Sequence, residues 1–194
     1  LLCETEKAST CGSLPIELQT TKNIFALMFL LRGIPFVDLA YLRKADIQGN
    51  TLRYRRRKTG RLLTVMLTPD AMKLIRIVAK TKPESPYLFP FLSSPEGTEA
   101  AYHEYQSSLR VFNYRLSRLK KYIKTAAHLS SYTIRHTWAT MAYYCEIHPG
   151  IISEAMGHSS IKVTETYLKP FQNEKIDNAN SQVISYVKEY ASIV

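Results

Sequence analysis

The chain has 194 residues, and 45% of them are hydrophobic, which is enough for one domain with a core of its own. Its net charge of +10 favours a polyanionic partner, nucleic acid before a membrane surface. No stretch approaches the roughly 18 apolar residues of a membrane span, and the three cysteines lack C-x-x-C spacing, which fits a reducing compartment. Because the chain starts at Leu1 rather than Met, we expect it to be part of a longer protein.

The first elements in chain order predict helices that lead into a β-hairpin. We interpret residues 1–20 as a leading segment or the end of a linker, the apolar run 22–31 as a buried helix, and residues 36–44 as a second helix. Residues 51–57 and 61–67 have strand character, and the Lys58-Thr59-Gly60 turn joins them into an antiparallel hairpin.

The predicted hairpin is strongly basic. Because side chains alternate along a strand, Arg53, Arg55 and Arg57 should share one face. The full set of cations that we assign to DNA contact is Arg53, Arg55, Arg56, Arg57 and Arg61, beside Lys58 in the turn. The alternative is a solvated edge strand whose charges prevent aggregation.

The second half of the chain predicts further helices. Thr68 should cap a helix that starts at Pro69, and the proline-rich connection 82–97 should pack residues 87–91 on the core. The remaining helices are expected at about 99–125, from a cap at Ser130 or Ser131 to 145, at 151–156, at 161–168 and at 182–190, the last after a polar hinge at 173–180. This pattern indicates a mainly α fold with a small antiparallel sheet (α+β), a main domain at 21–172, and a terminal helix that docks in cis or on a neighbouring subunit.

Three residues in the second half could perform phosphodiester cleavage together. Tyr167 lies nine residues after His158, in a Gly-His pair, and His158 lies twenty-three residues after Arg135. Cleavage needs a nucleophile, cations that stabilise the charged transition state, and an acid for the leaving oxygen. Guanidinium groups grip phosphate oxygens in bidentate fashion and favour a phenolate.

This ordered set resembles the C-terminal signature of the tyrosine recombinases, the phage-integrase family, of the bacterial mobile-element type. The resemblance covers residues 22–171 and implies a recombinase catalytic-domain fold that cleaves and rejoins DNA through a 3′-phosphotyrosyl link, without metal, ATP or other cofactor. It implies that Tyr167 is the nucleophile, that Arg32 and Arg135 stabilise the transition state, that Lys58 protonates the 5′ oxygen, and that His158 hydrogen-bonds the phosphate.

The sequence departs from the family pattern near two of these residues. Tyr132 stands three residues before Arg135, where the family has a histidine that accepts a proton. His136 could replace it, but a step of about 100° along a helix should point it elsewhere. An acidic residue usually follows the first arginine by about one helical turn, whereas Asp38 follows Arg32 by six residues.

The resemblance also implies partners and a location. We expect double-stranded DNA, a homotetramer on paired DNA sites, a monomer for the isolated domain, no membrane, and a cytoplasmic, nucleoid-associated bacterial protein. Family members usually carry an N-terminal helical domain that completes a clamp on DNA. The alternatives are a basic DNA-binding module that has lost its chemistry or a regulatory relative, and a type IB topoisomerase.

Two residues have a structural interpretation beside the catalytic one. Arg135 could be a buried ion-pair partner of Glu154 or Glu165, and His158 could be favoured by the dipole of a preceding helix. Cys145 and His148 have C-x-x-H spacing but no second ligand pair, so we predict no zinc site.

Overall fold

The computed structural model is mainly helical with one small antiparallel sheet, and it describes residues 14–79, 81, 83–168 and 173–191. This architecture is the predicted fold class, mainly α with a small sheet. The elements are α1 (Ile16–Leu30), α2 (Phe36–Ala40), the 3-10 turn η1 (Lys44–Asp46), β1 (Ile47–Gln48), β2 (Thr51–Arg55), β3 (Leu62–Met66), α3 (Pro69–Val78), α4 (Glu99–Tyr122), α5 (Thr133–Tyr144), α6 (Pro149–Met156), α7 (Ile161–Glu165) and α8 (Asn173–Ala191).

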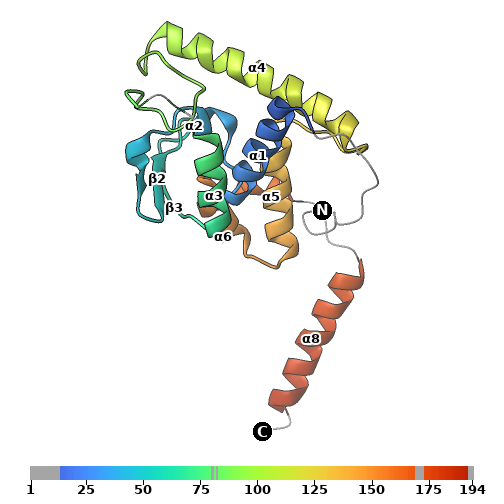
Figure 1. Cartoon of the computed structure of the whole chain (residues 1–194). Coiled ribbons are helices and arrows are strands. Elements are labelled where there is room, and N and C mark those ends of the chain that lie inside the picture. The colour runs from blue at the N-terminus through green and yellow to red at the C-terminus, as the bar shows by residue number, and fades with distance from the viewer. Residues whose placement is uncertain (1–13, 80, 82, 169–172, 192–194) are drawn as a thin grey trace.

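Helix α1 is the centre of the larger core. It packs against α3, α4 and α5, so three segments that are distant in sequence meet on one helix (Figure 1). Its residues Leu27 and Met28 are fully buried. The helix begins at Ile16, six residues before the predicted start at 22, so the end of the predicted leading segment is helical. The rest of that segment, residues 1–13, lies outside the described residues.

The sheet has the order β1-β2-β3, and all its pairs are antiparallel. Leu52 and Tyr54 of β2 are buried against the core, whereas Arg53 and Arg55 point to solvent, as alternation predicts. The pairing ends at Arg55, two residues before the predicted end of this strand. The chain therefore leaves the alternating pattern before Arg56.

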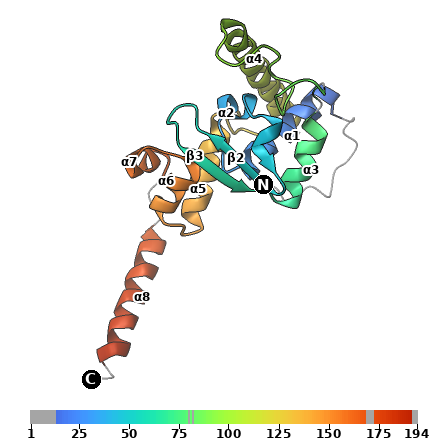
Figure 2. The ribbon, with the colours of Figure 1, turned by 90° about the vertical axis from the view of Figure 1, so that its left-hand side faces the viewer.

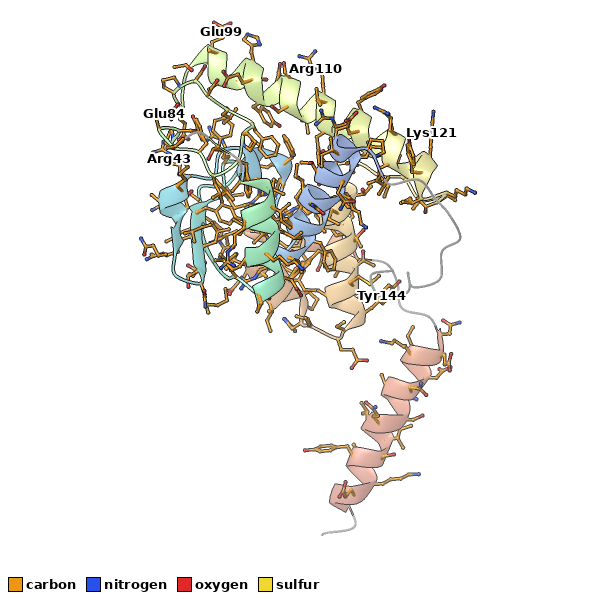
Figure 3. All side chains as sticks on the ribbon, viewed as in Figure 1. Arg43, Glu84, Glu99, Arg110, Lys121 and Tyr144 are labelled. Carbon is orange, nitrogen blue, oxygen red and sulfur yellow. The ribbon has the colours of Figure 1, made fainter. Side chains whose placement is uncertain are left out.

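Capping and apolar spacing account for the next helices. The Thr68 side chain accepts a hydrogen bond from the amide of Ala71 at 3.2 Å, which confirms the predicted cap. In the connection that follows, Phe89 is fully buried, as predicted for residues 87–91. Helix α4 buries Phe112, Leu116 and Leu119 against the core and directs charged side chains such as Arg110 and Lys121 outward (Figure 3).

A second, smaller core joins α5 to α6 and to Tyr167, which follows α7 (Ile161–Glu165). Its buried members are Ala139, Ala142, Ile152, Met156 and Tyr167. Helix α6 lies beside α5, and α7 lies beside α6, on the opposite side of the body from α3 (Figure 2). The residues that we predicted to be catalytic lie around this second core, because α5 carries Arg135 and the α6–α7 segment carries His158.

The predicted hinge at 173–180 is wrong, because these residues form the first half of α8. Glu174 lies in the first turn of α8 and Lys188 in the last, an arrangement that the helix dipole stabilises. The helix extends away from the body (Figures 1 and 2), and its described side chains are exposed. At its base the Lys175 ammonium donates to the Tyr144 carbonyl at 3.3 Å.

Candidate active site

Arg135 is a fixed, buried cation between the ends of two helices. It is 2% exposed, and its guanidinium donates to the Gly33 carbonyl at 3.0 Å and to the Met156 carbonyl at 2.8 Å. Burial and then Arg56 lower its pKa, while Tyr167 raises it through its charge and a side-chain hydrogen bond. Arginine stays protonated in such an environment. The ion pair with Glu154 or Glu165 that we considered is wrong, because carbonyl oxygens occupy this position.

Arg32 follows the end of α1, next to the contact between α1 and α5. Its φ of +59° is unusual for a residue with a side chain, and Gly33 continues with +66°. A Cβ on Gly33 would lie 3.0 Å from the Arg135 Cα and 3.2 Å from the Trp138 Cβ, so the two backbones meet here. The turn thus places Arg32 one residue from the contact with Arg135. Burial raises the pKa of the Tyr54 phenol, and the half-buried Arg32 is one of the cations that partly oppose this increase.

Tyr167 lies in the second core with its phenol at the edge of that core. It is 8% exposed, its amide donates to the Thr164 carbonyl at 2.9 Å, and its carbonyl accepts from the Thr140 hydroxyl at 3.1 Å. Its ring contacts two imidazoles, His158 at 5.2 Å between centroids with 19° between planes and His136 at 4.4 Å with 40°.

The Tyr132 hydroxyl lies 2.5 Å from the Tyr167 hydroxyl, and the two form a hydrogen bond. Burial, followed by this bond to Tyr167, raises the pKa of Tyr132 to about 12. Tyr132 is consequently protonated at neutral pH and can donate a hydrogen bond, but it is not a base. The residue that replaces the family's histidine thus contacts the predicted nucleophile directly.

His136 is the residue that sequence reasoning placed wrongly. Its ring packs on Tyr167 and also meets the Tyr132 ring edge-on at 4.8 Å between centroids. Burial and then Arg135 lower its pKa, so the imidazole is neutral at neutral pH. The sequence spacing could have indicated that His136 lies at the site, because Tyr132 and His136 are four residues apart and share one helical face.

His158 is buried and neutral. It is 3% exposed, and its Nδ1 is 2.8 Å from the Thr164 hydroxyl. Burial, then the charges of Arg135, Arg56 and Lys58, lower its pKa to about 4. Among the described residues its Nε2 has no hydrogen-bond partner, although buried polar atoms nearly always have one. A ligand atom that bonds this nitrogen would complete its environment.

The hairpin turn brings Lys58 to the same region. The turn spans Arg57 to Thr59, and Lys58 is exposed, although its charge is felt at His158. Thr59 in the turn and Arg61 just after it bond the α6–α7 segment: the Thr59 hydroxyl donates to the Gly157 carbonyl at 3.1 Å, and the Arg61 guanidinium donates to the His158 carbonyl at 2.5 Å. The predicted acid and the predicted phosphate ligand are thus neighbours.

One of the five predicted DNA-binding arginines is wrong. Arg56 is 5% exposed and forms a buried ion pair with Asp38, so it faces the protein interior. Arg57 is exposed, but its guanidinium bonds Glu96 at 2.5 Å and lies 3.7 Å above the Tyr41 ring. Two other members of the set, Arg53 and Arg55, remain on the solvent face of β2 and stay predictions for DNA contact.

Within the part of the chain that the structure describes, no group of three or more His, Cys, Asp or Glu side chains could hold a metal ion. His148 has a different role there, because its Nδ1 accepts the Gly150 amide at 3.0 Å at the start of α6. None of the described helices is long and apolar enough to cross a membrane.

Comparison with solved structures shows the class of fold. XerH recombinase, bound to a palindromic difH substrate in a post-cleavage complex, gives a TM-score of 0.60 at 16% identity over 87% of this chain and 47% of that chain. The Tn1549 transposon integrase in complex with transposon right end DNA gives 0.58 at 14% identity over 93% and 69%. The crystal structure of XerA recombinase gives 0.57 at 16% identity over 88% and 68%. The fold is that of a tyrosine recombinase catalytic domain.

Sequence comparison identifies the family. A family model described as "Phage integrase family" matches residues 13–174, and the chain belongs to this family. Tyrosine recombinase XerA of Saccharolobus solfataricus (strain ATCC 35092 / DSM 1617 / JCM 11322 / P2) is 27% identical over 126 residues, which are 65% of this chain. These 126 residues are 37% of the relative's length, so the chain spans a little over a third of that protein.

Proposed function

We propose that this chain is the catalytic domain of a site-specific DNA recombinase that cleaves and rejoins strands through Tyr167. The observation that carries the proposal is the environment of Tyr167. Its phenol hydrogen-bonds Tyr132, its ring stacks on His158, and it lies close enough to the buried Arg135 to raise the pKa of that residue. A nucleophile, a fixed cation and an unsatisfied imidazole nitrogen therefore surround one point.

The proposed cleavage step is an in-line attack on a phosphodiester. The Tyr167 oxygen forms a bond to phosphorus, and the bond from phosphorus to the 5′ oxygen breaks. Lys58 donates the proton that the leaving 5′ oxygen needs. The phenol proton passes to the neutral imidazole of His136 beside the ring. A 3′-phosphotyrosyl link and a free 5′-hydroxyl result.

The electrostatic roles follow from the same positions. Arg135 is already fixed by two carbonyls, so its charge needs little reorganisation to stabilise the transition state. Arg32, at the adjacent turn, is proposed as the second guanidinium. The unpartnered Nε2 of His158 is proposed to hydrogen-bond a non-bridging phosphate oxygen. Tyr132, as a protonated phenol, stabilises the Tyr167 phenolate by donating to it.

The proposed partner is double-stranded DNA, contacted by the exposed arginines of the hairpin. Recombination joins two duplexes, so we propose four protomers on paired sites and a monomer in their absence. The exposed helix α8 is proposed to dock on its own domain or on a neighbouring subunit in that assembly. The protein would accordingly be located with the nucleoid.

The test uses the complete polypeptide and nicked duplexes with a randomised core. Loss of the short fragment beyond the cleavage point prevents religation, so a cleaving enzyme becomes trapped on DNA. We expect the protein to form a covalent adduct with one site of the library, and Tyr167→Phe should abolish this adduct. DNA binding without any adduct from the library would instead support the alternative, a basic DNA-binding module that has lost its chemistry.

A further inference from the structure

The hairpin turn and the Gly157-His158 segment are joined more closely than the catalytic roles require. Thr59 and Arg61 each donate to a carbonyl of this segment, as described above. At Gly157, φ is +67°, and a Cβ would lie 2.8 Å from the Arg56 Cγ and 3.1 Å from the Leu63 Cδ1. The two segments therefore pack in direct contact, and two hydrogen bonds join them.

The other end of the turn is fixed to a different part of the protein. The Arg57 amide donates to the Asp38 carboxylate at 2.9 Å, and the Arg56 guanidinium pairs with the same carboxylate. Lys58 thus lies between two anchors. The residues before it are held by α2, and the residues after it are held by the segment between α6 and α7.

The second anchor continues to the nucleophile. The His158 ring bonds Thr164 through Nδ1 at 2.8 Å and stacks on the Tyr167 ring. The amide of Tyr167 in turn donates to the Thr164 carbonyl at 2.9 Å. A short series of contacts therefore leads from the turn that carries Lys58 to the residue that attacks.

We propose that Thr59 and Arg61 are positioning residues, which fix Lys58 relative to Tyr167 through the carbonyls of Gly157 and His158. The inference rests on the proposed function, because Lys58 must be the acid for its position to matter. Arg61 then has a role within the protein in addition to the DNA contact that its charge suggested. Loss of either contact leaves the nucleophile in place but moves the acid away from the 5′ oxygen.

A sulfur substitution separates this role from a general structural one. In a 5′-bridging phosphorothiolate, Tyr167 attacks phosphorus, the bond from phosphorus to sulfur breaks, and the sulfur leaves as a thiolate with its electron pair. The thiolate needs no proton from Lys58, since a thiol is far more acidic than an alcohol. A variant that has lost only the action of the acid should recover on this substrate.

The experiment measures single-turnover adduct formation by the complete polypeptide on the selected nicked site, with either oxygen or sulfur at the 5′ position. Lys58→Ala shows the full effect of losing the acid, and its adduct formation on the oxygen substrate should be slower by about 100-fold or more. We expect Thr59→Val and Arg61→Met to be slowed about five- to tenfold on oxygen and to approach the wild-type rate on sulfur. Their ratio of sulfur to oxygen rates should rise accordingly.

Matched variants control for the hydroxyl and the charge. Thr59→Ser keeps a hydroxyl and should keep the wild-type ratio. Arg53→Met removes an equal charge from the same hairpin, so it should weaken DNA binding and leave the ratio unchanged. Arg135→Ala should be slowed equally on both substrates, because its charge acts on the phosphate rather than on the leaving group.

The outcomes distinguish this inference from the proposed function. If Thr59→Val and Arg61→Met are slowed equally on both substrates, the contacts have a structural role and the inference is overturned. If Lys58→Ala is not rescued by sulfur, Lys58 is not the acid and the inference is overturned with it. If the wild-type polypeptide forms no adduct on either substrate, the proposed function itself is wrong.

Discussion

Replacing Tyr132 by phenylalanine tests how the nucleophile is activated. The substitution removes one hydroxyl, which lies 2.5 Å from the Tyr167 hydroxyl, and leaves the ring that packs on His136. Because its pKa is about 12, Tyr132 is protonated at neutral pH and can donate a hydrogen bond to the Tyr167 oxygen as charge develops there. We therefore expect slower cleavage, with little change in the position of the ring.

The magnitude follows from the type of bond and from its exposure. A hydrogen bond to a charged group contributes about 1.5–3 kcal/mol, which corresponds to roughly 10- to 150-fold in rate. Tyr132 is 52% exposed, so water can replace part of the lost bond, and the lower end of this range applies. The expected loss for Tyr132→Phe is thus about tenfold in the rate of adduct formation.

The assay is single-turnover adduct formation on the selected nicked site at saturating protein. Tyr102 is a matched control, since it is also 52% exposed and its hydroxyl accepts from Gln106, far from the site. Tyr102→Phe should keep the wild-type rate. An unchanged or faster rate for Tyr132→Phe would refute the reasoning, and a faster rate would show that Tyr132 restrains Tyr167.

Three further predictions concern stability and DNA binding. Asp38→Asn should lower the free energy of unfolding by about 3–5 kcal/mol in urea titrations, because it leaves the buried Arg56 charge unpaired; an effect below about 1 kcal/mol would contradict this. The pKa of His158 falls from 6.5 unfolded to about 4 folded, so the unfolded chain binds the extra proton between these values and stability decreases as pH falls through them. The part of the loss between pH 7 and 5 that is due to His158 should be about 2 kcal/mol in urea titrations, and His158→Gln should lose that much less than the wild type; equal losses in both proteins would count against a buried neutral imidazole. Arg53→Ala and Arg55→Ala should each reduce the slope of log affinity against log salt by about 1, and unchanged slopes would show that β2 does not contact phosphate.

The sequence predicted the elements of this fold well where local patterns decide them. The apolar spacing of α4, the cap at Thr68 and the hairpin around Lys58 all depend on residues close together in the chain. Local patterns were less reliable at boundaries. Residues 173–180 are polar, which suggested a hinge, but polar residues with favourable end charges also form exposed helices.

The candidate site was harder to predict, because its contacts join residues that are distant in sequence. Arg56 resembled its basic neighbours, and only the buried carboxylate of Asp38, eighteen residues earlier, explains why it turns inward. His136 was assigned away from the site because it is adjacent to Arg135 on a helix. The ring of Tyr167 contacts His136 on α5 and is also close enough to Arg135 to raise the pKa of that arginine.

The most direct test of the central claim is to identify the tyrosine that becomes linked to DNA. Adduct from the selected nicked site would be digested with protease and nuclease, and the peptide that carries the nucleotide would be sequenced by mass spectrometry. The account predicts a 3′-phosphotyrosyl bond at Tyr167 alone. A link at Tyr132, whose oxygen lies 2.5 Å from that of Tyr167, or at any other residue would contradict it.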